Sequence, residues 1–169
     1  EKIRAFLSEM IKGFDAGIYR DPWGLGEIAN EDMVNVYAAI RILEAFQPEL
    51  LVVNMQDSDI GHSHFTGYCN NLRKADYTLY QLWQAIQSVP GMKDGTILIV
   101  APEFGRNREP NTLVDEFGRR AVEHTGDPTS REIFCLVLGP SHVVKQGEVI
   151  DKVAGGSIDI VPTIAEILG

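Results

Sequence analysis

LLVVNM, at residues 50–55, is the stretch that decides the fold class predicted for this chain. It is short, continuous and apolar with β-branched residues at its centre, which is typical of a strand buried on both faces of a parallel sheet. TILIVAP at 96–102 and EIFCLVLG at 132–139 have the same character, and residues 142–150 predict a weaker fourth strand. The sequence therefore predicts an α/β domain with a mainly parallel sheet flanked by helices.

Helical patterns surround these strands. The predicted helices cover residues 1–14, about 30–47, 66–87 and 157–169. Apolar residues spaced by three and four carry the prediction, Asn30 is a suitable N-cap, and Pro48 stops the second helix. Pro162 falls in the first turn of the last helix, where its missing N–H costs little. We therefore expect a single domain over residues 1–169, with a helical lead-in over 1–47.

The charge composition excludes several classes of partner. The chain has 15 Lys and Arg against 24 Asp and Glu, a formal net charge of -9. Binding to nucleic acid or to an anionic membrane surface depends on clustered cations, so we expect no nucleic-acid partner. No apolar run reaches the roughly 18–20 residues that cross a bilayer, so we expect no membrane span. The oligomeric state is left open.

Polar connections adjoin the three predicted strands and hold three of the chain's four histidines. The candidate metal ligands in these connections are Asp57, Asp59, His62, Glu103 and His124. Ligands of parallel sheets gather beyond the carboxyl ends of the strands, so we expect these side chains to converge there. Carboxylates and imidazoles bind divalent cations, and the donors leave zinc, manganese, magnesium and calcium open.

Arginines crowd the irregular segment 103–131 of this acidic chain. Arg106, Arg108 and Arg131 are candidates for binding a phosphate or sulfate group, because a guanidinium makes bidentate hydrogen bonds to such oxyanions. The alternative is that the arginines form salt bridges with nearby carboxylates. Those carboxylates are Glu109, Asp115, Glu116 and Glu123.

Four segments together resemble the alkaline phosphatase superfamily. They are PELLVVNMQDSDIGH, EHTGDPTSREIFCLVLGP, which is similar to cofactor-independent phosphoglycerate mutases, SIDIVPTIAEILG, which is similar to sulfatases, and EFGR, which resembles an often exported branch. The resemblance runs from about residue 47 to residue 169. It implies an alkaline-phosphatase-like fold, a two-metal hydrolase or transferase of small phosphate or sulfate esters, and an extracytoplasmic, periplasmic location.

The resemblance also implies the ligand sets. One cation would be held by Asp57 or Asp59 with His62 and His124. The family spacing lands on Ser58, so either Asp57 or Asp59 must shift, or the loop is altered. The second cation would lie near Glu103, but Phe104 stands where the family has a ligating histidine, and phenylalanine offers no lone pair.

The chain begins with two predicted helices, where the family carries the nucleophile and another aspartate. We therefore expect an incomplete domain that is not catalytic by itself. Two functions stay open. One is a metal-dependent ester hydrolase or transferase that is incomplete in this chain. The other is a non-catalytic domain of the same kind that binds an anionic ligand or a protein partner.

Overall fold

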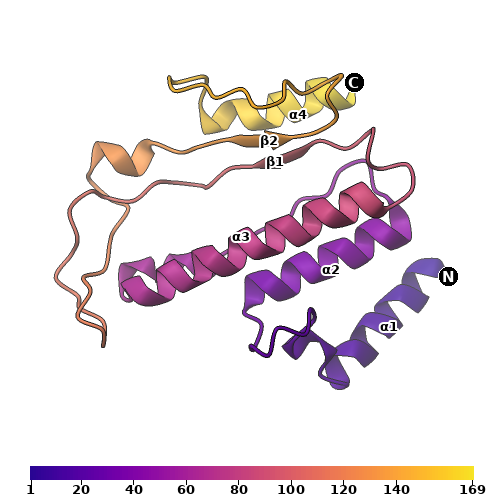
Figure 1. Cartoon of the computed structure of the whole chain (residues 1–169), viewed down its shortest axis with the longest axis horizontal. Coiled ribbons are helices and arrows are strands. Elements are labelled where there is room, and N and C mark those ends of the chain that lie inside the picture. Colours follow the sequence, from indigo (N-terminus) through magenta and orange to yellow (C-terminus); the bar gives the residue numbers. More distant parts are fainter.

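The structure is a computed structural model that describes residues 1–169. The helices are α1 (Lys2–Asp15), α2 (Glu31–Phe46), α3 (Phe65–Ser88) and α4 (Ile160–Leu168), and the strands are β1 (Leu98–Val100) and β2 (Leu136–Leu138). Four short 3-10 helices are η1 (Ile18–Arg20), η2 (Asp57–His62), η3 (Pro128–Arg131) and η4 (Ser157–Asp159). Figure 1 shows the two strands between α4 on one side and the α2–α3 pair on the other, with α1 beyond α2.

The core lies where α2 packs against α3. Its buried apolar residues are Val36, Ile40, Leu43, Leu82, Ile86, Val89 and Met92. Burying one large aliphatic side chain stabilises a fold by about 1.5–3 kcal/mol, so this helix pair is the main source of stability. The exposed apolar side chains of α1 and α4 contrast with it, because α4 has no buried residue and α1 buries only Gly13. None of the helices has both the length and the apolar character that a membrane span requires.

The four predicted helices are confirmed, and their ends follow from local chemistry. The Asn30 side chain accepts a hydrogen bond from the Met33 backbone N–H at 3.1 Å, which caps α2. Gln47 takes a left-handed conformation with φ 46° and ends the same helix just before Pro48. Pro162 lies in the first turn of α4, as the sequence predicts.

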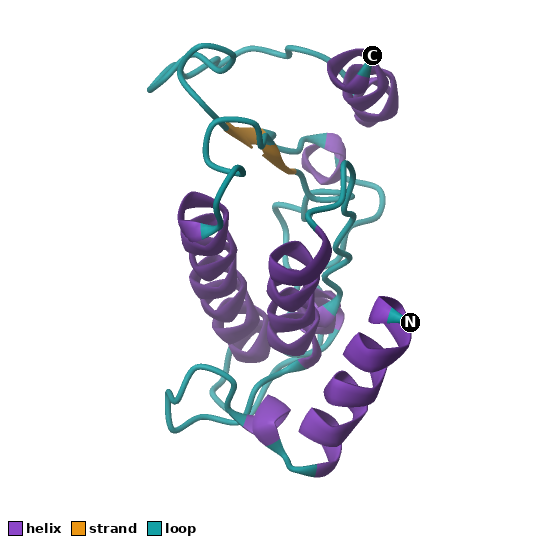
Figure 2. Ribbon diagram, turned by 90° about the vertical axis from the view of Figure 1, so that its right-hand side faces the viewer, coloured by secondary structure: helices purple, strands orange, loops and turns teal.

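The predicted fold class, a mainly parallel sheet flanked by helices as in alkaline phosphatases, is wrong. β1 and β2 form a two-stranded antiparallel sheet in which Leu98 pairs with Leu138 and Val100 with Leu136. A parallel pair needs a crossover that returns the chain to the starting end, usually through an α-helix. The connection from β1 to β2 contains only irregular chain and η3, so β2 runs back along β1 (Figure 2).

The second and third predicted strands are confirmed, because they contain β1 and β2, but the first and fourth predicted strands are wrong. Residues 50–55 form neither a helix nor a strand, and they belong to no sheet. Leu51, Val53 and Met55 pack against the core, whereas the side chain of Val52 between them is 78% exposed. The helices, and not neighbouring strands, therefore bury the apolar side chains on one face of this segment. Residues 142–150 contain turns and no strand.

The segment 103–131 is irregular, as predicted, except for η3 at its end, and it folds back on itself. Asn111 N–H donates to Ala121 O at 2.8 Å, and Asp115 N–H donates to Arg119 O at 2.9 Å. Gly118 supplies the positive φ of 77° at the turn. We call residues 107–124 the excursion hairpin. Its returning arm is tied to η2, because Val122 N–H donates to Gly61 O at 2.9 Å.

Candidate metal centre

Asp59 and His62 meet because the chain between them is a 3-10 helix. A 3-10 helix has three residues per turn, so side chains at positions i and i+3 lie directly above one another. Both residues belong to η2, and Asp59 Oδ1 lies 3.0 Å from His62 Nε2. In an α-helix the same two side chains would still share a face, but they would be offset by about 60° around the axis. The local conformation of DSDIGH therefore creates a pair of metal-ligand groups.

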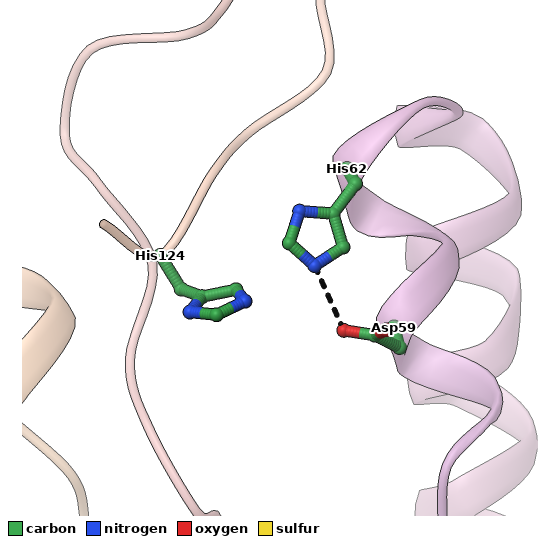
Figure 3. Close-up of side chains that lie close together, drawn as sticks. All are labelled: Asp59, His62 and His124. Carbon is green, nitrogen blue, oxygen red and sulfur yellow. Dashed lines mark hydrogen bonds and ion pairs between the residues drawn. The ribbon is translucent and has the colours of Figure 1, made fainter.

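His124 joins this pair from the end of the excursion hairpin. Its ring centroid is 4.6 Å from that of His62, and the two rings are inclined at 65°. One ligand atom from each of Asp59, His62 and His124 lies within 4.8 Å of the other two. Figure 3 shows His62 and Asp59 projecting from the same helical turn toward His124, which comes from a separate stretch of chain. We call these three residues the DHH cluster.

Asp57 lies outside the DHH cluster and has a structural role. Its Oδ2 accepts a hydrogen bond from the Asp32 backbone N–H at 2.7 Å, at the start of α2. In return, Asp32 Oδ1 accepts from the backbone N–H groups of Gln56, at 2.6 Å, and of Asp57. Burial raises the pKa of Asp32, although these two backbone donors oppose the shift. Of the two aspartates that the sequence left open, Asp59 is therefore the one placed beside the histidines.

The second ring nitrogen of His62 contacts Glu123, which the sequence analysis treated only as a partner for arginine. His62 Nδ1 lies 2.6 Å from Glu123 Oε2. Asn111 Nδ2 donates to Glu123 Oε1 at 3.0 Å. The hydrogen bond to His62, followed by that from Asn111, holds the pKa of Glu123 below its ordinary value. The sequence offered one signal for this carboxylate, its position directly before His124.

Phe104 and Arg106 form the wall beside His124. The Phe104 ring stacks on the His124 ring with centroids 3.8 Å apart and an angle of 20°. The Arg106 guanidinium lies over the rings of Phe104 and Tyr68, at 5.4 and 5.2 Å from their centroids. Arg106 Nη2 donates to Ser58 O at 2.9 Å and lies 3.7 Å from Asp59 Oδ1. A positive charge thus borders the DHH cluster.

Arg106 is held tightly, since its side chain is only 14% exposed. Its Nη1 is buried without a hydrogen-bond partner in the protein. The guanidinium also packs on Gly61, where an added Cβ would lie 3.2 Å from Arg106 Cζ. The glycine before His62 therefore leaves room for this arginine.

The other residues predicted from sequence are not brought to the cluster. Glu103 is exposed and takes no part in a hydrogen bond or ion pair. Arg108 is exposed, and only its backbone N–H is engaged, with Asp127 Oδ2 at 2.9 Å. Arg131 is exposed in η3. The carboxylates proposed as salt-bridge partners do not pair with these arginines: Asp115 binds backbone and Thr66 groups, and Glu116 contacts His64.

The donor set of the DHH cluster fits a divalent cation. Two imidazole nitrogens and one carboxylate oxygen are typical protein ligands of zinc, with a fourth position open to water or substrate. Ligands about 2.0–2.2 Å from one cation lie roughly 3–4 Å apart, so only a small closure of the present spacing is needed. Magnesium and calcium favour oxygen donors, so a site with two nitrogen ligands favours zinc over either of these metals.

Comparisons with known proteins identify no relative. No protein-family model matches the chain, and neither a curated protein nor a solved structure matches it.

Proposed function

We propose that this chain holds one divalent cation of the zinc class through Asp59, His62 and His124, and that the cation serves the hydrolysis or transfer of phosphate or sulfate esters. The observation that carries the proposal is the convergence of the three ligand atoms within 4.8 Å. The motifs quoted above resemble those of a superfamily in which such chemistry occurs, and the proposal takes from that resemblance the chemistry and not the fold.

The neighbouring residues support an anionic ligand. A bound cation of this kind polarises an ester oxygen and lowers the pKa of a hydroxyl or water that attacks it. Arg106 places a permanent positive charge beside Asp59, and its buried Nη1 has no partner in the protein. Guanidinium groups bind phosphate and sulfate oxygens through charge-assisted hydrogen bonds. In the proposal, Arg106 attracts and orients the anionic group that approaches the cation.

A second candidate function is a non-catalytic domain that holds the cation and binds an anionic ligand or a protein partner. The stacking of Phe104 on His124 favours it. One face of that imidazole is covered by an apolar ring, which cannot contribute a ligand to a second cation. Burying a dication against apolar surface is costly unless its coordination is complete. Both candidates share the cation site and differ in turnover.

The cation site can be tested by titrating the metal-free chain with Zn²⁺ in competition with a chromophoric chelator. We expect one tight site per chain. The affinity should fall sharply in His124→Ala. His142→Ala is the matched control, because His142 lies in the turn after β2 and belongs to no ligand cluster. Absence of tight binding, or equal loss in both variants, would overturn the proposal.

The ester chemistry needs a separate test on the zinc-loaded chain. We expect orthophosphate or sulfate to bind more weakly when Arg106 is changed to Gln, because the permanent charge beside Asp59 is lost. Since the motif that would carry the nucleophile has no counterpart in the sequence, we expect no appreciable hydrolysis of an aryl phosphate or aryl sulfate by this chain alone. Metal-stimulated hydrolysis that disappears in His124→Ala would contradict that expectation and exclude the non-catalytic candidate.

A further inference from the structure

We infer that Glu123 is a positioning residue for the cation: it fixes the protonation and the orientation of His62 so that Nε2 is the ligand atom. The inference rests on the proposed cation site. Its starting point is the short contact between Glu123 Oε2 and His62 Nδ1, at 2.6 Å.

The chemistry of the contact assigns the proton. An ionised carboxylate only accepts hydrogen bonds, so the ring nitrogen facing Glu123 must carry a hydrogen. In a neutral imidazole the other nitrogen then holds the free lone pair. His62 Nε2 is that atom, and it faces Asp59 Oδ1 at 3.0 Å. Two lone-pair atoms at this distance need a proton or a cation between them, and the neighbouring His124 supplies a third donor.

Glu123 is itself held in place. Asn111 Nδ2 donates to Glu123 Oε1 at 3.0 Å and to His62 O at 2.8 Å, so one amide connects the carboxylate with the backbone of the histidine. Asn111 Oδ1 accepts from Leu113 N–H at 2.9 Å, which fixes the amide's orientation. The backbone of the returning arm is anchored by Asn107 N–H, which donates to Glu123 O at 2.7 Å. The carboxylate thus has a defined position before any cation arrives.

The excursion hairpin therefore contributes two residues with different roles to the cation site. It supplies one ligand, His124, and directly before it the carboxylate that orients another ligand. Residues that hydrogen-bond a metal-bound histidine raise its basicity and fix its tautomer, and their loss typically weakens metal binding by about 10–100-fold.

The same molecule contains a matched control pair. Glu116 Oε2 lies 2.6 Å from His64 Nε2, on the same hairpin and beside the same end of α3. His64 belongs to no metal-ligand cluster. Changing Glu116 removes an equivalent carboxylate–imidazole contact without touching the DHH cluster.

The experiment compares Zn²⁺ affinity of the whole chain and its variants by chelator competition. Glu123→Ala should weaken binding by roughly 10–100-fold, and Asn111→Ala by less, because the carboxylate remains. Glu116→Ala should leave the affinity unchanged. Circular dichroism reports whether each variant stays folded, and Asn111→Ala keeps the inference testable if Glu123→Ala does not fold.

A second readout separates positioning from charge. Long-range ¹H–¹⁵N spectra of the zinc-loaded chain identify which nitrogen of His62 is protonated, and we expect Nδ1 in the wild type. Glu123→Gln keeps one oxygen that can accept from Nδ1 but loses the acceptor for Asn111 Nδ2, so it should retain that tautomer and lose no more affinity than Asn111→Ala does. Glu123→Asp keeps the charge but shortens the reach, so it should lose both the tautomer and the affinity.

These experiments distinguish failure of the proposed cation site from failure of the role assigned to Glu123. If the wild type binds no Zn²⁺, the proposed cation site fails. If the wild type binds Zn²⁺ and His62→Ala does not, but Glu123→Ala binds as tightly as the wild type, the cation site stands and the inference about Glu123 is overturned. The inference would also be overturned if Glu123→Asp kept as much Zn²⁺ affinity as Glu123→Gln, because the charge alone would then be sufficient.

Discussion

His62 and His64 are two residues apart, and each lies 2.6 Å from a glutamate of the excursion hairpin, yet their surroundings differ. The second nitrogen of His64 is already used, because Nδ1 accepts the Gly67 backbone N–H at 2.8 Å and caps α3. The second nitrogen of His62 faces Asp59 and lies close to His124. One histidine ends a helix, and the other has a donor atom available to a cation.

The comparison shows that a carboxylate contact does not by itself make a metal ligand. What matters is the partner of the remaining nitrogen. A backbone N–H occupies the lone pair of His64, whereas only lone-pair donors surround Nε2 of His62. Sequence spacing cannot separate the two residues, since both follow the same strand-like segment and both lie before α3.

The strongest way to break the comparison is to remove each imidazole in turn. His62→Ala deletes a proposed ligand, so Zn²⁺ affinity should fall by more than the roughly 100-fold upper range for residues that only orient a ligand. His64→Ala should leave affinity within a few-fold of wild type. Chelator competition measures both, and equal losses would show that the two histidines share one function.

The next largest expected effect is a loss of stability in acid, caused by protonation of Asp115, which anchors the excursion hairpin beside His64. Asp115 has a completely buried side chain. Its burial works to raise its pKa, but hydrogen bonds from Thr66 Oγ1 and from the backbone N–H groups of Arg119, Thr66 and Phe117 outweigh this and hold the pKa well below the usual range. A depressed pKa in the folded state stabilises the fold above the ordinary value of 3.8, and the contribution is lost as pH falls below it.

We therefore expect thermal stability to drop as the pH is lowered from about 4 toward 2, by the linkage between pKa and folding. Asp115→Asn should be less stable than wild type at neutral pH and should lose less of its stability in acid. Each Asp115 oxygen accepts two hydrogen bonds. Asparagine keeps one of these oxygens, but its NH₂ group cannot accept the two hydrogen bonds made to the other. Melting curves between pH 7 and 2 test this, and identical acid profiles would contradict it.

A smaller effect is expected from the helix cap. Replacing the N-cap of α3 in His64→Ala should lower stability by about 1 kcal/mol, the typical cost of losing a capping side chain. His62→Ala should cost less, because His62 caps no helix. Chemical denaturation of the metal-free variants measures the difference. A larger loss for His62→Ala would reverse the assigned roles.

The smallest effect is expected at Gly61. In Gly61→Ala the new Cβ would lie 3.2 Å from Arg106 Cζ and Nη2 and from Tyr68 Cδ2. Arg106 would have to move by a few tenths of an ångström, at a cost of roughly 1 kcal/mol, the low end of the range for overpacking, because its side chain is flexible. Zn²⁺ affinity should change little, because the ligands keep their positions. A large loss of affinity would show that the position of Arg106 is coupled to the cation site.

The helices of this fold and the positions of β1 and β2 could be predicted from sequence, but the pairing of the strands could not. Apolar spacing, the Asn30 cap and Pro48 are local signals, and local hydrogen bonds satisfy a helix. A strand needs a partner from elsewhere in the chain. LLVVNM has the composition of a buried strand, but its inward side chains are covered by α2 and α3 instead. The run predicted a strand, but no neighbouring strand pairs with it.

The candidate site was likewise predictable only in part: its ligand residues could be identified from sequence, but the contacts that depend on the fold could not. Asp59, His62 and His124 could be picked out because their residue types are metal ligands in polar connections. The choice between Asp57 and Asp59 depended on the 3-10 turn of η2 and on the reciprocal hydrogen bonds of Asp57 with Asp32. Glu123 and Asn111 could not be found, because their roles arise from the antiparallel path of the hairpin, which brings residue 123 to residue 62.

The central claim is that one cation is bound by two imidazoles and one carboxylate of this chain. Zinc K-edge X-ray absorption of the chain loaded with one equivalent of Zn²⁺ measures this most directly, because imidazole rings give a distinct multiple-scattering pattern. The account predicts two histidine nitrogens at about 2.0–2.1 Å, with the remaining ligands oxygen at about 2.0–2.2 Å. A spectrum with no histidine ligand, or with sulfur from Cys69 or Cys135, would contradict it.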